Sequence, residues 1–301
     1  MHDIDWYWVW IPATILAAAA QTARNTMQRH LTATLGTTGA THVRFLYGVP
    51  FALVFLAVAA VLAGRPPPVP DGEALAWIAT GALAQVLATG AMLAAMKTQS
   101  FALAVAYTKT EPVQVALFGA VALAEPTSPA GVAAILLATA GVIAMSGNPW
   151  RAGAVDWRAT ALGLLSGGLF AISAVAYRGG ILKLGEPVFW FAALTALACA
   201  LALQAGLLSL WLVATDRPAL GRVFAAWRPS LFAGAMGACA SAFWFTAFSL
   251  ASAAAVRTLA LVEVLFSYAV GRGVLRQKVA GHEVAGLVLV VAGVALLLLS
   301  A

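Results

Sequence analysis

The chain is dominated by long apolar runs, each about as long as a bilayer is thick. A membrane-spanning helix needs about 20 mostly apolar residues, and we count ten such runs along the 301 residues. Only 9% of the residues are charged, against about 25% in a soluble protein. We therefore expect an all-α integral membrane protein with ten spanning helices, at roughly 8–31, 40–63, 74–96, 101–124, 129–147, 158–178, 187–212, 229–250, 254–275 and 282–300.

The fourth and ninth runs differ from the other eight, because only they carry ionisable side chains near their centres. AVAYTKTEPVQ contains Lys109 and Glu111, and SAAAVRTLALVEVLF contains Arg257 and Glu263. A constant offset of 152 aligns Ala95 with Ala247, Ser100 with Ser252, Glu111 with Glu263, and 140–142 with 292–294. We therefore predict two repeats of five helices, 1–150 and 151–301. Because each repeat has an odd number of helices, the second repeat crosses the membrane in the opposite orientation to the first. Interrupted helices at matching places in two repeats point to a transport site.

The four charged residues have two interpretations. A charge inside a bilayer costs at least about 2.5–3.5 kcal/mol, so such groups normally face a water-filled path or a partner. In the first interpretation, Glu111 and Glu263 face a water-filled path and bind substrate or protons. In the second, the four residues form structural ion pairs, with Lys109 and Arg257 as the cations. Residues two or six apart do not share a helix face, so any pairing must run between helices.

Uncharged polar side chains inside the predicted helices are candidates for binding a small molecule. Tyr107, Thr110 and Gln114 share one helix face, at spacings of three, four and seven. Each polar residue is also explained by a hydrogen bond between helices, and that alternative stays open. The candidate substrate-binding residues are Gln21, Asn25, Gln85, Thr89, Tyr107, Thr110, Gln114, Ser173, Tyr177 and Trp244. We expect them to surround one central cavity.

Several classes of function lack their sequence signals. No phosphate-binding loop, dinucleotide-binding motif, nucleophile elbow or metal-ligand cluster is present, so we predict no enzyme activity, cofactor or metal. The basic residues are scattered between apolar runs, which argues against a nucleic-acid partner. Cys199 and Cys239 lie inside apolar runs and are expected to be buried thiols. The glycine spacings Gly163–Gly167 and Gly286–Gly293 favour close helix packing, compatible with a monomer or a weak dimer.

The two halves resemble the drug/metabolite transporter superfamily in its ten-helix form with two EamA-type repeats. The similarity lies in AMKTQSFALAVAYTKTEPVQVALFGAVALAEPTSPAGVAAILLATAGVIA and its counterpart AFSLASAAAVRTLALVEVLFSYAVGRGVLRQKVAGHEVAGLVLVVAGVALL. Glu125 resembles the acidic residue that closes the fourth helix of a repeat, whereas the second half has 276–278 RQK there. Within the superfamily the chain looks most like amino acid exporters of the YddG type.

This resemblance implies a secondary transporter of the bacterial inner membrane, working by alternating access. The expected substrates are amino acids, including aromatic ones, or similar small metabolites. Two alternatives remain, namely efflux of lipophilic cations or drugs and, outside transport, a membrane scaffold. Most Lys and Arg lie on the side opposite the termini, which places the termini outside. The resemblance implies both termini in the cytoplasm, so the orientation stays open.

Overall fold

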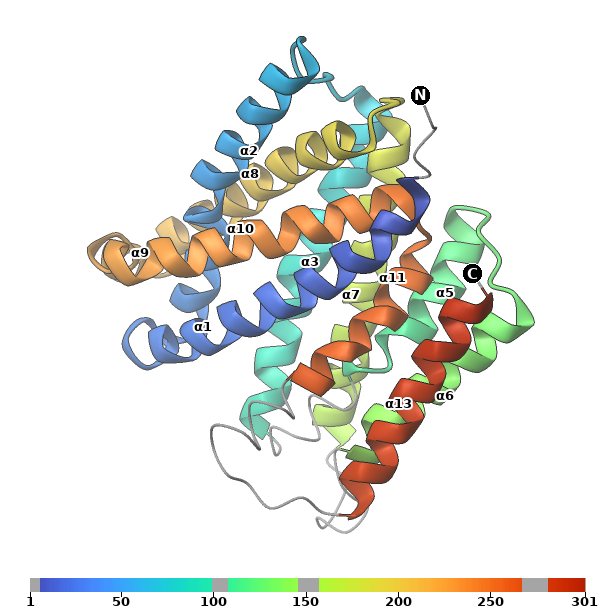
Figure 1. Ribbon diagram of the computed structural model, residues 1–301. Helices are drawn as coiled ribbons and strands as arrows, with labels where there is room; N and C mark the ends of the chain where they lie inside the picture. The colour runs from blue at the N-terminus through green and yellow to red at the C-terminus, as the bar shows by residue number, and fades with distance from the viewer. Residues whose placement is uncertain (1–5, 99–107, 146–156, 267–280, 301) are drawn as a thin grey trace. The chain divides into compact units, whose positions relative to one another are not determined.

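The computed structural model describes residues 6–98, 108–145, 157–266 and 281–300, and the regular structure within these ranges is helical (Figure 1). The described elements are η1 Trp6–Val9, α1 Trp10–Leu46, α2 Gly48–Ala63, α3 Gly72–Thr98, α5 Glu111–Ala122, α6 Pro129–Met145, α7 Trp157–Lys183, α8 Phe189–Thr215, α9 Arg217–Ala225, α10 Trp227–Leu250, α11 Ala253–Leu259, η3 Ala260–Val262 and α13 Gly281–Ser300.

Six described segments are long and apolar enough to cross a bilayer. They are Thr38–Ala63, Gly72–Met92, Thr160–Lys183, Phe189–Thr215, Trp227–Leu250 and Gly281–Ser300. These correspond to the second, third, sixth, seventh, eighth and tenth predicted helices. The apolar helices α5 and α6 are shorter. The structure therefore supports a multi-pass, all-helical membrane protein, but within the described residues it does not confirm ten spanning helices or inverted repeats.

The predicted connection between the first two helices, 32–39, contains the break at Gly36, and the second spanning segment is Thr38–Ala63. The helix α1 continues through the expected connection, and its non-helical residue is Gly36, at φ 69° and ψ 175°. Glycine lacks the Cβ that makes this backbone conformation costly for other residues. The chain turns back there, so residues on both sides of Gly36 meet in one core cluster. That cluster contains Leu31, Leu35, Ala40, Val43, Val223 and Ala233.

The predicted connection after α8 also contains a helix that the sequence analysis missed. The carboxylate of Asp216 accepts a hydrogen bond from the backbone N–H of Ala219 at 3.0 Å, which caps the first turn of α9. Pro218 follows in that turn, where a missing N–H has no cost. An aspartate cap with a proline in the first turn is a recognisable helix start, so the signal was present in the sequence.

Parts of the fourth and ninth predicted helices lie outside the described residues, namely 101–107 and 267–275. What the structure describes of the fourth is the turn from Thr108 and then α5. In the ninth, α11 is followed by the single turn η3. Residues 263–266 after η3 are again helical, so both charged segments lie where helical pieces meet.

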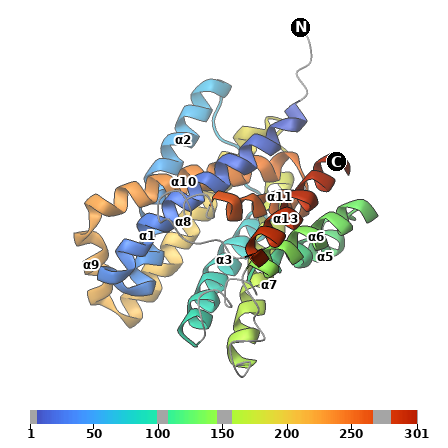
Figure 2. The same ribbon diagram turned by 60° about the horizontal axis from the view of Figure 1, so that its bottom comes forward.

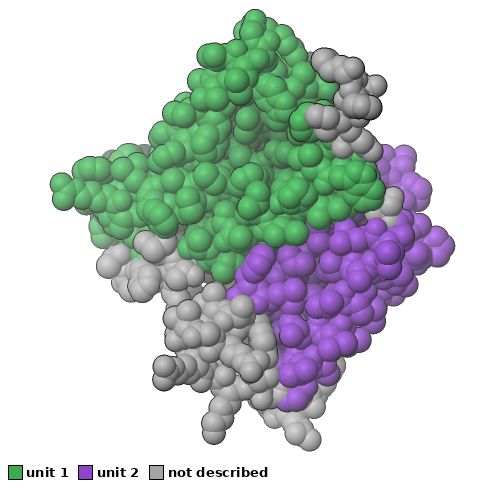
Figure 3. All heavy atoms as spheres, viewed as in Figure 1, with its two compact units in different colours: residues 1–83, 176–251 green, residues 84–175, 252–301 purple. Residues whose placement is uncertain are grey.

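The chain forms two compact units, coloured separately in Figure 3. Unit 1 comprises residues 1–83 and 176–251, and unit 2 comprises 84–175 and 252–301. Each unit thus takes segments from both predicted repeats, and the boundaries fall inside α3 and α7. The division into repeats at 1–150 and 151–301 concerns sequence similarity and remains a prediction.

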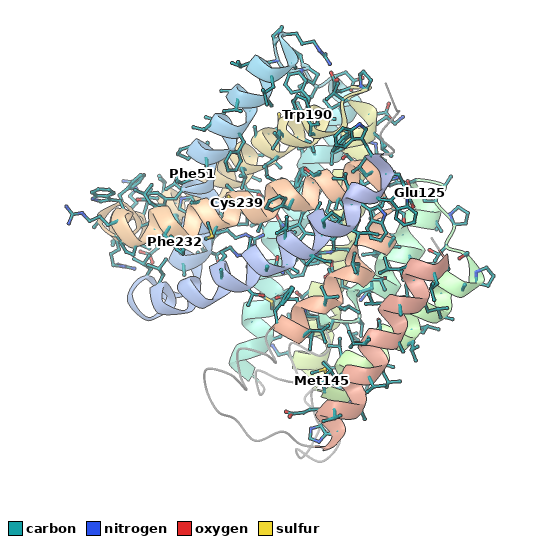
Figure 4. All side chains as sticks on the ribbon, in the orientation of Figure 1. Phe51, Glu125, Met145, Trp190, Phe232 and Cys239 are labelled. Atoms are coloured by element: carbon teal, nitrogen blue, oxygen red, sulfur yellow. The ribbon has the colours of Figure 1, made fainter. Side chains whose placement is uncertain are left out.

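In unit 1, α1 packs along α10, and α2 packs on α8. The helices α1 and α10 lie side by side in both Figure 1 and Figure 2. Gly234 of α10 permits a close helix contact, because a Cβ added there would lie 2.5 Å from the carbonyl oxygen of Tyr47. The thiols Cys199 and Cys239 are free and half-buried rather than buried as expected (Cys239 is labelled in Figure 4).

In unit 2, α6 and α13 pack closely through glycines. A Cβ added at Gly286 would lie 2.5 Å from the carbonyl oxygen of Gly141 and from Cγ of Met145, which Figure 4 labels on α6. A Cβ added at Gly293 would lie 2.6 Å from the backbone nitrogen of Ala138. The prediction that Gly286 and Gly293 mediate helix packing is confirmed, and the contact lies within one chain.

Candidate functional site

The charged residues of the fourth and ninth segments form two ion pairs within unit 2. Arg257 Nη2 lies 2.5 Å from Glu111 Oε1, and Lys109 Nζ lies 3.3 Å from Glu263 Oε2. Each carboxylate is therefore paired with a cation from the other half of the chain, as the spacing argument required. We call Lys109, Glu111, Arg257 and Glu263 the charge cluster.

The charge cluster is only partly covered by protein. The side chains of Glu111 and Glu263 are each 13% exposed, that of Arg257 is 15% exposed and that of Lys109 is 23% exposed. An ion pair in such a place is sensitive to the loss of one member, because the remaining charge keeps its desolvation cost. The cluster combines two acids and two bases, so it carries no net charge when all four are ionised.

The start of α5 fixes two members of the cluster. Lys109 lies in the turn before α5, and Glu111 is the first residue of the helix, with Pro112 next to it. A carboxylate is favourable in a first turn, where the helix N–H groups point outward. On the other segment, the Ser252 hydroxyl accepts from the backbone N–H of Ala255 at 3.3 Å and caps α11, which carries Arg257.

Gln114 lies one turn after Thr110 and against two glycines of α7. Gln114 Nε2 donates to Thr110 Oγ1 at 3.2 Å. A Cβ added at Gly167 would lie 3.0 Å from Gln114 Nε2, and one at Gly168 would lie 2.8 Å from Gln114 Oε1. The glycines therefore accommodate a polar side chain, and Gly167 also lies close to a backbone, since its added Cβ would be 3.3 Å from the carbonyl oxygen of Thr108. The structure brings Thr110 and Gln114 together as expected.

In unit 1, two predicted residues meet across the contact of α1 with α10. Trp244 Nε1 donates to Gln21 Oε1 at 3.3 Å, and the Trp244 ring stacks on Phe248 with centroids 6.3 Å apart. This places an amide and an aromatic surface next to each other. We call Gln21, Trp244 and Phe248 the amide–aromatic group.

Tyr177 is almost fully buried in unit 1, with 2% of its surface exposed. Its hydroxyl accepts from Gln204 Nε2 at 3.0 Å, and its ring lies 4.6 Å from that of Phe245. A Cβ added at Gly81 would lie 2.7 Å from the same ring. These contacts show a packed hydrogen-bonding tyrosine, and its contact with a substrate remains a prediction.

The other predicted residues are distributed over the two units. Thr89 Oγ1 donates to the carbonyl of Gln85 one turn earlier at 2.8 Å, and Ser173 is buried in α7. Tyr107 lies outside the described residues, as does the side chain of Asn25 on α1. Gln21, Asn25, Tyr177 and Trp244 belong to unit 1, whereas Gln85, Thr89, Thr110, Gln114 and Ser173 belong to unit 2. That all of them surround one cavity stays a prediction.

The sequence analysis missed a buried cation, Arg24 of α1, which is 4% exposed. It expected ionisable groups near the middle of only the fourth and ninth runs, yet Arg24 lies inside the first and shares a helix face with Gln21 three residues earlier. That spacing was the available signal. Arg178, at the end of the sixth predicted run, lies inside α7, and its Nη1 donates to the Phe248 carbonyl at 2.5 Å.

A further ion pair connects two loop segments of unit 1 outside the spanning helices. Arg65 Nη1 donates to Glu186 Oε2 at 2.7 Å, and the second nitrogen of the guanidinium contacts the other carboxylate oxygen. The hydrogen bond from Arg65 is the main reason that the pKa of Glu186 lies below its usual 4.5, with a smaller contribution from the Val188 N–H. A shallow pocket beside Glu186 is lined by Ile181, Leu182, Gly185, Pro187, Phe189, Ala192 and Ser249.

None of the predicted binding residues lines that pocket. Among the described residues, no three His, Cys, Asp or Glu side chains gather as a metal site requires. In unit 2, the paired carboxylates and cations could each take a charged group of a substrate as an alternative partner. In unit 1, the amide of Gln21 and the ring of Trp244 offer a polar and an aromatic contact. Together with the apolar helices, these features define a multi-pass membrane protein with polar groups held between helices.

Comparison with known proteins supports the same class. Residues 8–147 match the model of the EamA-like transporter family, so this part of the chain is similar to that family. The match indicates a membrane transporter of small molecules rather than an enzyme. No curated protein matches the sequence.

Several solved structures have a similar fold, and one of them is the crystal structure of a protein. It has a TM-score of 0.71, covers 98% of this chain and 98% of its own length, and is 17% identical in sequence. At that identity the similarity concerns the fold alone.

Proposed function

We propose that the protein is a secondary transporter of the bacterial inner membrane that exports amino acids, aromatic ones included, by alternating access. The similarity of residues 8–147 to the EamA-like family supports transport of small molecules. The charge cluster carries the proposal further, because charged side chains inside a membrane are costly and mark substrate or ion paths as well as ion pairs. A zwitterion carries one positive and one negative group and matches a cluster of two acids and two bases.

The pairing of both acids favours a zwitterion over a lipophilic cation. Glu111 and Glu263 each already contact a protein cation. A lipophilic cation gains only by displacing Arg257 or Lys109, whereas an ammonium and a carboxylate on one molecule can replace both partners of a pair. Competition of amino acid exchange by a lipophilic cation separates these functions, and we expect little competition.

The first experiment is counterflow with purified protein in liposomes, using a labelled mixture of amino acids. We expect exchange of a subset that includes aromatic amino acids. If folded protein exchanges none of them, the proposed substrate class is wrong. Because a carrier needs no coupling ion for counterflow, this result does not depend on whether export is coupled to protons.

The role of the charge cluster is tested by Glu111→Gln, which removes the carboxylate charge and keeps the shape. We expect counterflow to fall about tenfold or more, since charge-assisted contacts contribute about 1.5–3 kcal/mol. Glu73→Gln is the matched control, because Glu73 is 58% exposed and pairs with Lys183 outside the cluster. Unchanged counterflow in Glu111→Gln excludes a role of Glu111 in transport.

A further inference from the structure

Two arginines of α1 meet at one glycine of α10. A Cβ added at Gly237 would lie 3.5 Å from Cδ of Arg24 and 3.7 Å from Cγ of Arg44. The two side chains are therefore neighbours on the same surface of α10, although they are 20 residues apart in sequence. The turn at Gly36 makes this possible, because it reverses the chain between them.

Two neighbouring arginine side chains need negative charge or strong acceptors nearby, and the guanidinium carbon of Arg44 lies 5.1 Å from the centroid of the Phe45 ring. Arg24 is buried and Arg44 is half-buried, and like charges repel more strongly where water is excluded. Both residues take part in interactions within the chain. Each guanidinium has five N–H donors in a planar fork, so one that has a protein partner can still bind a carboxylate.

The amide–aromatic group lies on the same two helices as this arginine pair. Gln21 precedes Arg24 by three residues, so both lie on one face of α1, about 4.5 Å apart along the axis. Trp244 follows Gly237 by seven residues, two turns along the same face of α10. The Gln21–Trp244 hydrogen bond at 3.3 Å confirms that these faces meet. A cationic end and an aromatic end therefore lie along one helix contact, within unit 1.

We infer that Arg24, next to Arg44, binds the carboxylate of the transported molecule, and that Gln21 and Trp244 contact its aromatic part. This inference rests on the proposed function and narrows it to substrates that bear a carboxylate close to a flat apolar group. In phenylalanine only Cα and Cβ stand between the carboxyl carbon and the ring, which suits neighbouring turns of one helix. Guanidinium and carboxylate form paired parallel hydrogen bonds, which an amide or an alcohol cannot reproduce.

The test compares ligands with and without the carboxylate on intact protein. Phenylalanine and phenylalaninamide compete for counterflow in liposomes, and phenylpropionate and phenylpropanol are titrated in detergent by tryptophan fluorescence. For the unmodified protein we expect the carboxylate form to bind about tenfold to a hundredfold more tightly. Equal affinity for the two forms overturns the inference without requiring any variant to fold.

Variants then assign the effect to Arg24. In Arg24→Gln we expect phenylalanine and phenylpropionate to lose about tenfold or more in affinity, while phenylalaninamide and phenylpropanol change little. Arg24→Lys should be intermediate, because an ammonium keeps the charge without the fork. Arg222→Gln is the matched control, since Arg222 is exposed on α9. A parallel loss for acid and amide indicates a structural role and overturns the inference.

The outcomes separate the inference from the proposed function. If Arg24→Gln exchanges amino acids and still prefers carboxylates over amides and alcohols, the inference is wrong and the proposed function stands. Arg24-dependent binding of phenylpropionate without exchange of any amino acid refutes the proposed substrate class and supports the carboxylate site.

Discussion

In unit 2 the four residues of the charge cluster pair acid with base, whereas in unit 1 the predicted binding residues Tyr177 and Trp244 bind neutral partners. Glu111 and Glu263 each contact a cation. Tyr177 instead accepts from Gln204, and Trp244 donates to Gln21. Removing one member of an ion pair leaves a charge with a high desolvation cost, while removing one neutral partner leaves a smaller deficit. We therefore expect the two units to respond differently to substitution.

The largest effect is expected for Arg257→Gln in unit 2. Losing the 2.5 Å contact with Glu111 should destabilise the protein by about 2–4 kcal/mol, somewhat less than for a fully buried pair. Thermal unfolding in detergent measures it. In Arg257→Gln with Glu111→Gln the isolated charge is gone, so at least half of the loss should return. A double variant as unstable as the sum of both single variants contradicts this account.

The two units should respond alike to changes in helix packing, because each contains a glycine that lies against backbone atoms. Gly286→Ala in unit 2 and Gly234→Ala in unit 1 each place a Cβ 2.5 Å from a carbonyl oxygen. We expect both to cost about 1–3 kcal/mol through overpacking. Gly206→Ala in α8 is the control, since nothing lies within 4 Å of its Cβ position, and it should be neutral or stabilising by up to about 1 kcal/mol.

Tyr177→Phe measures the neutral hydrogen bonding of unit 1. The variant removes the acceptor of Gln204 Nε2, which retains a long contact of 3.5 Å with the Ala82 carbonyl. We expect a loss of about 1 kcal/mol, clearly below that of Arg257→Gln, measured in the same unfolding assay. A loss equal to that of Arg257→Gln would remove the distinction between the two units.

The smallest effect is expected at the loop ion pair of Arg65 with Glu186, in which the arginine side chain is 43% exposed and the glutamate side chain 3% exposed. Because the pKa of Glu186 is lowered in the folded protein, its contribution to stability is present above its usual pKa of 4.5 and disappears as pH falls through the lower folded value. Glu186→Gln should therefore lower the melting temperature slightly at neutral pH and hardly at all in strong acid. A difference from the unmodified protein that grows toward acid contradicts this sign.

The helices were predictable where apolar length alone determines them. The predicted spans 74–96, 229–250 and 282–300 end within two residues of α3, α10 and α13, because charged or turn-forming residues flank a continuous apolar run. Around Gly36 the predicted connection had the right place but was too long, because a helical pattern continues on both sides of a single backbone reversal. The prediction failed at α9, whose sequence is too polar to resemble a membrane helix.

The sequence alone determined that this is a helical membrane protein, that it carries the EamA-type pattern, and that any pairing among the charges of its fourth and ninth apolar runs must be between helices. These follow from hydropathy and helix periodicity, which are local properties. Only the tertiary structure decided which cation meets which acid, that Gly167 and Gly168 accommodate Gln114, and that Arg24 and Arg44 share one surface of α10. Such contacts depend on how a turn of the chain and the packing of distant helices bring residues together, and no spacing along the sequence specifies that.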